Sequence, residues 1–136
     1  MIGLDANVVV RYLAQDDPDQ SAAASALMDE LTETNPGYLS LVTVVEIYWV
    51  LRRSYGVTAA RGGELLDGLV HARELRIDRG EVVRAALTAA ESGVDFPDAV
   101  IAELGRGAGC RHTVTFDRRA ARSGAMHLLG AARPGR

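Results

Sequence analysis

The 136-residue sequence contains no lysine, because all 15 of its basic residues are arginine. Enzymes that depend on an essential lysine are therefore excluded. The single cysteine, Cys110, cannot form an internal disulfide, so the fold does not depend on an oxidising compartment. The longest apolar run, residues 39–45, is interrupted by Ser40 and Thr43 and is far shorter than the roughly 20 residues that a membrane helix needs.

The composition, with 48% hydrophobic and 24% charged residues, is typical of a chain that buries a core. We expect one domain over residues 1–129, followed by a flexible tail at 130–136, where Pro134 and Gly135 discourage regular structure. The start of the chain has an acid at position 5 and no basic, apolar export signal. Together with the lone cysteine, this predicts a cytoplasmic protein.

Charge is distributed unevenly along the chain. Residues 106–136 hold seven arginines and one acid, a net charge of +6, whereas the preceding 105 residues hold eight arginines and 17 acids, a net charge of −9. This asymmetry indicates an anionic partner for the basic part. The alternative is a solvated, partly frayed tail.

Short apolar runs alternate with helical patterns. The strands are expected at 1–4, 38–42, 75–77 and 112–116, and the helices at 8–13, 18–31, 44–51, 58–72, 78–92 and from 95 to the glycines at 105–109. Strands separated by helices favour an α/β sandwich around a mainly parallel sheet.

Four acids lie at the ends of predicted strands or at the starts of predicted helices. Asp5 ends the first strand, Glu46 lies just after the second, Asp98 opens the sixth helix and Asp117 follows the fourth strand. Sites in open α/β sheets form outside the carboxyl ends of the strands, so the four could converge there. Carboxylates brought together repel one another and imply a cation, and ligation by oxygen alone selects Mg²⁺ or Mn²⁺. The predicted chemistry is metal-assisted hydrolysis.

Each acid also has a structural explanation. Thr43 and Glu46 match a capping box, Asp98 suits the dipole of a first helical turn, and Asp117 could be a turn residue. Asp5 is harder to explain in this way, because an acid directly after a buried strand is costly unless it is hydrogen-bonded or ligated.

Four motifs in order resemble the PIN-domain family, and within it the VapC-type toxin ribonucleases of toxin–antitoxin pairs. The resemblance extends to about residue 128. Its motifs are Ile2-Gly-Leu-Asp5-Ala-Asn7, then Ser40, Thr43 and Glu46, then Asp95-Phe-Pro-Asp98-Ala-Val-Ile-Ala102, and finally Thr115-Phe-Asp117. The resemblance implies a PIN-like three-layer α/β sandwich with a mainly parallel four- or five-stranded sheet flanked by helices.

The resemblance also implies a metal-dependent endoribonuclease in which Asp5, Glu46, Asp98 and Asp117 bind Mg²⁺ or Mn²⁺. Supporting roles fall to Asn7, Thr43 and Thr115, and Asp95 is interpreted as a cap. From their position after Asp117, we expect Arg118, Arg119 and Arg122 to bind RNA, with a solvated basic helix as the alternative.

The resemblance implies three partners: an RNA substrate, a small antitoxin that covers the acids, and a second copy of the chain. Tyr48, Trp49, Leu51 and Tyr55 crowd the third helix, which suggests an apolar groove for such a partner unless the fourth helix buries them. A dehalogenase-like phosphatase and a receiver domain both need the missing lysine. A PIN-fold protein that binds RNA or a partner without cleaving RNA is the remaining alternative.

Overall fold

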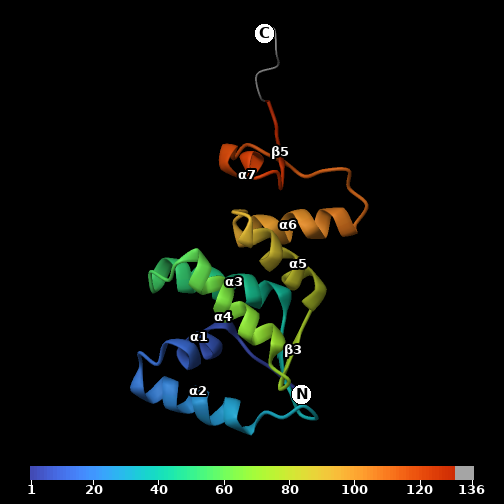
Figure 1. Cartoon of the computed structure of the whole chain (residues 1–136). Helices are drawn as coiled ribbons and strands as arrows, with labels where there is room; N and C mark the ends of the chain where they lie inside the picture. The colour runs from blue at the N-terminus through green and yellow to red at the C-terminus, as the bar shows by residue number, and fades with distance from the viewer. Residues whose placement is uncertain (131–136) are drawn as a thin grey trace. The chain divides into compact units, whose positions relative to one another are not determined.

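The computed structural model describes residues 1–130 (Figure 1). The tail predicted for 130–136 lies outside the described residues, apart from Gly130. The chain divides into two compact units, Met1–Val83 and Arg84–Arg136. No helix among the described residues is long and apolar enough to cross a membrane.

The first unit contains a parallel three-stranded sheet in the order β1-β2-β3. Its strands are β1 (Ile2–Gly3), β2 (Gly37–Leu39) and β3 (Leu75–Ile77), and its helices are α1 (Ala6–Ala14), α2 (Pro18–Glu30), α3 (Leu41–Ser54), α4 (Ala59–His71) and the start of α5 (Gly80–Glu91). In the register, Gly37 lies between Ile2 and Leu75. A Cβ at Gly37 would come within 2.8 Å of Leu4 and 2.9 Å of Leu31, so a side chain there would force these two leucines to shift.

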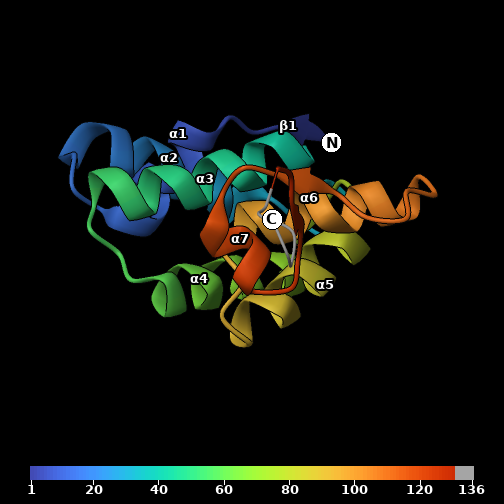
Figure 2. The ribbon, with the colours of Figure 1, turned by 90° about the horizontal axis from the view of Figure 1, so that it is seen from above.

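Helix packing in this unit follows the apolar stripes of the sequence. α1 contacts both α2 and α3, and α3 contacts α4; α1 and α3 lie alongside each other in Figure 2. Leu39, Ile47 and Leu66 are completely buried. Burial of each such side chain contributes about 1.5–3 kcal/mol relative to exposure, so this core holds the helices against the sheet.

The apolar crowding on α3 is largely internal. Tyr48 and Leu51 are buried, and a Cβ at Gly62 of α4 would come within 3.1 Å of the Tyr48 ring. The hydroxyl of Tyr55 donates to Asp16 at 2.8 Å, which lowers the pKa of that carboxyl. For Tyr48 and Leu51 the alternative, burial inside the fold, therefore holds. Trp49 is the exception, because 43% of it is exposed.

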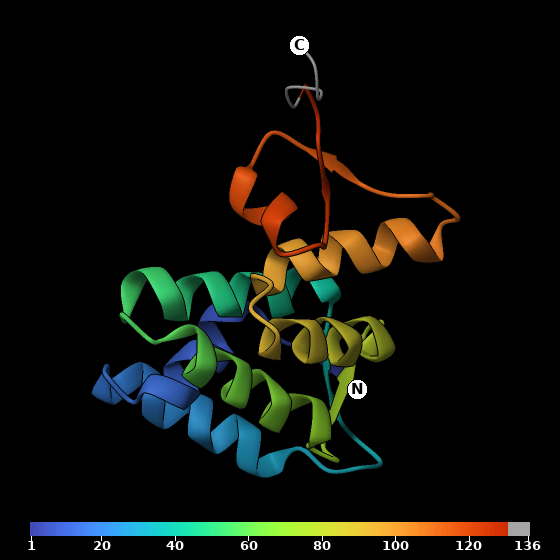
Figure 3. The same ribbon diagram turned by 45° about the horizontal axis from the view of Figure 1, so that its top comes forward.

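The second unit holds the end of α5, α6 (Phe96–Gly107), β4 (Val114–Thr115), α7 (Arg118–Arg122) and β5 (His127–Leu128). β4 and β5 pair in parallel, and the chain returns from one to the other through α7 (Figure 3). Val114 pairs with His127, and the His127 amide donates to the Thr113 carbonyl at 2.8 Å.

Gly105 permits a close approach between α6 and the segment that leads into β4. A Cβ there would lie 2.9 Å from the Thr113 hydroxyl oxygen. The first of the glycines predicted to end the sixth helix thus has a packing role, and the helix itself continues to Gly107.

The α/β class and the parallel strands are confirmed, with seven helices within residues 1–130. The five strands form one three-stranded and one two-stranded sheet. The strand predicted at 38–42 ends at Leu39, because Ser40 caps α3 and Leu41 is already helical. β5 was not among the four strands located from the sequence.

Candidate active site

Asp5 caps the first helix. Its Oδ1 accepts a hydrogen bond from the Ala6 amide at 2.8 Å, and α1 begins there. The residue is exposed, as are Ile2 and Gly3 of β1. The argument that Asp5 follows a buried strand is therefore wrong, and its local role is explained by capping. Asn7, in the first turn of α1, is also exposed.

Glu46 is not part of a capping box. Ser40 is the N-cap of α3, and its hydroxyl accepts from the Thr43 amide at 3.1 Å and donates to the Thr43 hydroxyl at 2.9 Å. Glu46 lies beyond the first turn and is exposed. Within residues 1–130 its carboxylate has no hydrogen bond or ion pair. The capping box therefore does not explain why an acid occurs at position 46.

Asp98 lies in the first turn of α6 and is only partly exposed. Burial raises its pKa, the charges of Asp95 and Asp117 raise it further, and Arg119 partly offsets them. Asp95 occupies the N-cap position of α6, but its side chain makes no capping hydrogen bond. The interpretation of Asp95 as a cap therefore holds for its position only, and its charge contributes to raising the pKa of Asp98.

Asp117 caps α7 as Asp5 caps α1. Its Oδ1 accepts from the Arg119 amide at 2.8 Å and more weakly from the Ala120 amide at 3.4 Å. The Thr115 hydroxyl accepts from the Asp117 amide at 3.0 Å, so Thr115 fixes the turn that presents the acid. Arg118, Arg119 and Arg122 are all exposed on α7.

The predicted acids fall into two pairs. Asp5 and Glu46 belong to the first unit, where β1 and β2 are parallel neighbours, so α1 and α3 start from the same edge of the sheet. Asp98 and Asp117 belong to the second unit, and their charges act on each other. Residues 1–130 contain no group of three or more histidine, cysteine, aspartate or glutamate side chains placed to hold a metal ion. The convergence of all four acids stays a prediction.

The donor set nevertheless suits a hard cation. Asp5 and Asp117 each use Oδ1 for capping, and within the described residues their Oδ2 atoms make no hydrogen bond. A carboxylate pair whose repulsion raises the pKa of Asp98 is stabilised by a bound cation. All of the available donors are carboxylate oxygens, the ligands that Mg²⁺ and Mn²⁺ take.

Comparison with known families decides the identity of the fold. The sequence model of the PIN domain matches residues 2–125. The chain belongs to the PIN domain family. PIN domains are generally nucleases that act on RNA and typically use divalent metals, which agrees with the carboxylate donors described above. No curated protein matches the chain.

Two features of this PIN domain were not foreseen from the sequence. One is the effect of Arg119 and Asp95 on the pKa of Asp98. Asp95 lies three residues before Asp98, at the N-cap of α6, whereas Arg119 lies on α7. Their effect on Asp98 can be recognised only once the positions of α6 and α7 are known. The second is the stacking of His112 on His127, with ring centroids 4.2 Å apart.

Asp98 makes stability depend on pH in a defined direction. Its ordinary pKa of 3.8 is raised on folding, so the folded state holds the proton more tightly and loses stability as pH rises from below 3.8 through the raised pKa. Asp98→Asn removes the charge at every pH. We expect the variant to melt a few degrees above the wild type at pH 7, and the difference to vanish near about pH 3, in calorimetric scans.

Glu91→Gln is the matched control, since Glu91 is an exposed acid on α5 of the same unit. Its melting temperature should follow that of the wild type at both pH values. A variant at Asp98 that is destabilised at pH 7 would contradict the raised pKa.

Proposed function

We propose that this PIN domain is a metal-dependent endoribonuclease in which Asp5, Glu46, Asp98 and Asp117 hold Mg²⁺ or Mn²⁺. The observation that carries the proposal is the electrostatic strain at Asp98, whose carboxyl is partly buried beside two other acids. A structural cap does not need such neighbours. Groups with a perturbed pKa next to like charges are typical of functional sites.

The metal, when bound, supplies a nucleophilic water at neutral pH and neutralises charge on the scissile phosphate. The protein residues hold the metal-binding carboxylates in place. Capping through Oδ1 fixes the carboxylates of Asp5 and Asp117 while leaving Oδ2 for ligation. Thr115 holds the Asp117 turn, Ser40 and Thr43 hold the start of α3, and Asn7 adds an exposed amide beside Asp5.

The first test uses one acid from each unit. Asp5→Asn and Asp98→Asn remove charge but keep volume, so each should lower Mg²⁺-dependent cleavage of single-stranded RNA by roughly two orders of magnitude or more. Binding should also be visible without turnover, because Mg²⁺ relieves the repulsion at Asp98. Mg²⁺ should therefore raise the melting temperature of the wild type more than that of Asp98→Asn.

Asp29→Asn, an exposed acid on α2, should keep full activity and serves as the control for a changed surface charge. Full activity in excess chelator would refute the metal mechanism. Loss of cleavage in Asp98→Asn but not in Asp5→Asn would refute a site shared by both pairs. Metal and RNA binding without any cleavage would favour a non-catalytic RNA-binding PIN protein.

We further propose that Arg118, Arg119 and Arg122 bind the RNA backbone. The support is their exposure on α7, which Asp117 caps, and the field that Arg119 exerts at Asp98. Arginine offers a planar fork of donors that matches phosphate oxygens. A substrate strand at the acids would therefore meet compensating positive charge.

Replacing the three arginines with glutamine should weaken RNA affinity and flatten its salt dependence. If all three contact phosphates, the slope of log K against log salt should fall by about 2, at roughly 0.7 per contact with a single strand. Fluorescence anisotropy in chelator measures this without hydrolysis. Arg84→Gln, an exposed arginine on α5, is the control; equal slopes for all proteins would favour the solvated-helix alternative.

We also propose that the chain is the toxin of a VapBC-type pair, with a cytoplasmic antitoxin and a homodimeric or hetero-oligomeric assembly. The support is one face of α3, where Val42, Glu46 and Trp49 recur at helical spacing. Val42 is 77% exposed, and the Arg53 guanidinium lies 4.9 Å from the Trp49 ring centroid. A partner that covers these apolar side chains also covers Glu46.

Co-expression with the product of the neighbouring reading frame tests this partner. We expect the chain to be harmful alone, harmless with the partner, and to copurify with it in a complex larger than a monomer by size exclusion. Trp49→Ala should lose copurification, whereas Leu129→Ala, an equally exposed apolar residue, should keep it. A harmless, monomeric protein with no copurifying partner would refute the toxin role and leave the nuclease proposal standing.

A further inference from the structure

A pocket of about 430 Å³ lies within the second unit. It is lined by the end of α5, by one face of α6 and by residues from 110 to 127. Neither Asp98 nor Asp117 lines it, so it is separate from the acid pair. Its volume falls within the roughly 300–1,000 Å³ of small-molecule sites and is sufficient for one nucleotide.

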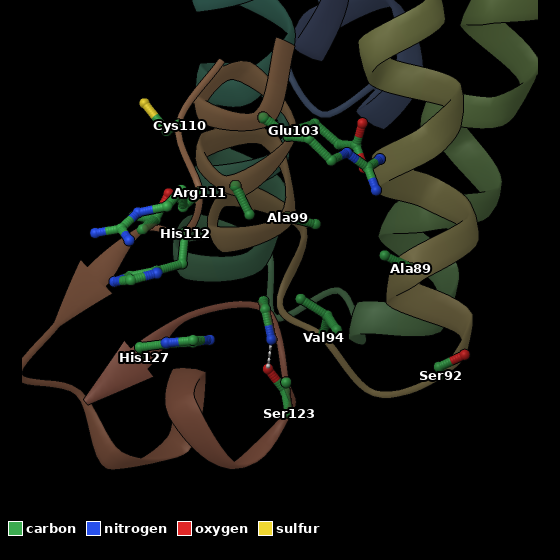
Figure 4. A pocket seen from close by; sticks show the side chains of 15 residues that line it. Ala89, Ser92, Val94, Ala99, Glu103, Cys110, Arg111, His112, Ser123 and His127 are labelled. Carbon is green, nitrogen blue, oxygen red and sulfur yellow. Dashed lines mark hydrogen bonds and ion pairs between the residues drawn. The ribbon is translucent and has the colours of Figure 1, made fainter. Parts of the chain in front are cut away.

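One side of the pocket is rich in nitrogen donors. Arg111, His112 and His127 lie along that side in Figure 4. The single carboxylate in the lining, Glu103, is already paired with Arg106. Arg111 has no ion-pair partner within residues 1–130. The uncompensated charge therefore favours an anion, and a guanidinium favours phosphate in particular.

The two histidines are held in place by the fold. Their rings stack with centroids 4.2 Å apart and planes 12° apart. The β4–β5 ladder fixes this arrangement, because the His127 amide donates to the Thr113 carbonyl at 2.8 Å. An imidazole offers at least one N–H donor in either protonation state. The stack thus presents two neighbouring donors at the positively charged side.

The opposite lining contains small aliphatic side chains next to Ser92 and the paired Glu103. Figure 4 labels Ala89, Val94 and Ala99 on the α5 and α6 side of the pocket. These small aliphatic side chains have no hydrogen-bonding groups and leave room for a flat group. A phosphate at one end and a flat base against the aliphatic side chains are two of the three parts of a nucleotide, and its ribose joins them.

We propose that this pocket binds a single nucleotide, with its phosphate at Arg111, His112 and His127 and its base against the alanines and Val94. The nucleotide comes either from the phosphorylated end of an RNA strand or from the free mononucleotide pool. Binding does not require the nuclease activity, because the pocket contains neither Asp98 nor Asp117.

Nuclear magnetic resonance of the imidazole C–H groups in chelator tests the proposal, with adenosine 5′-monophosphate as the probe. Only three histidines are present, so His71 on α4 is an internal control. We expect the signals of His112 and His127 to shift while that of His71 stays. Arg111→Gln should weaken binding roughly tenfold through loss of a charge-assisted contact, and Arg84→Gln should not.

Adenosine represents the base and ribose of the probe, and inorganic phosphate represents its phosphate group. Each should bind more weakly than the whole nucleotide. The proposal would be overturned if phosphate bound as tightly as the nucleotide, or if Arg111→Gln bound the nucleotide as tightly as Arg84→Gln does. It would also be overturned if the signals of His112 and His127 did not shift. RNA carrying a 5′-phosphate, compared with the same RNA carrying a 5′-hydroxyl, then identifies the source. Shifts that depend on the 5′-phosphate assign the pocket to an RNA end, and shifts with the mononucleotide alone assign it to the free pool.

Discussion

The rest of the structure depends on the junction where a parallel strand passes into a helix. The first turn of every helix leaves backbone N–H groups without intrahelical partners, and oxygen side chains satisfy them. Asp5, Ser40 and Asp117 do this at α1, α3 and α7. Because the strands of each sheet are parallel, their carboxyl ends share an edge. The requirement to cap helices therefore puts carboxylates where open α/β sheets form their sites.

Capping and metal ligation are compatible uses of one carboxylate. A cap engages one oxygen and restricts the side chain to a single orientation, and both Asp5 and Asp117 engage Oδ1 only. The orientation is then set by the fold before any ligand arrives, which lowers the entropic cost of binding. The structural explanation of Asp5 and Asp117 is thus no argument against a functional one. Glu46 lacks even that explanation, because Ser40 supplies the cap of α3.

The sequence predicted most elements because their signals are local: apolar runs for β2 and β3, helical spacing for α1 and α4, and the four ordered motifs for the family. The start of α3 was misplaced because both Ser40 and Thr43 are N-cap residues, and the folded backbone uses Ser40. β5 was not located from the sequence, although it is no shorter than β1 and β4. The stacking of His112 on His127 and the field of Arg119 at Asp98 arise between segments distant in sequence, which no local signal encodes.

The charges around Asp98 show why acids and arginines occur in the same unit. Burial and the charges of Asp95 and Asp117 raise the pKa of Asp98, and Arg119 offsets part of that effect. A fold selected for stability alone would neutralise one of these acids. Acids by themselves also repel a polyanion, whereas exposed arginines on α7 attract it. Placing the acids together disfavours their charged forms and the nearby arginine opposes that effect, an arrangement that suits the proposed site for a cation and a phosphate.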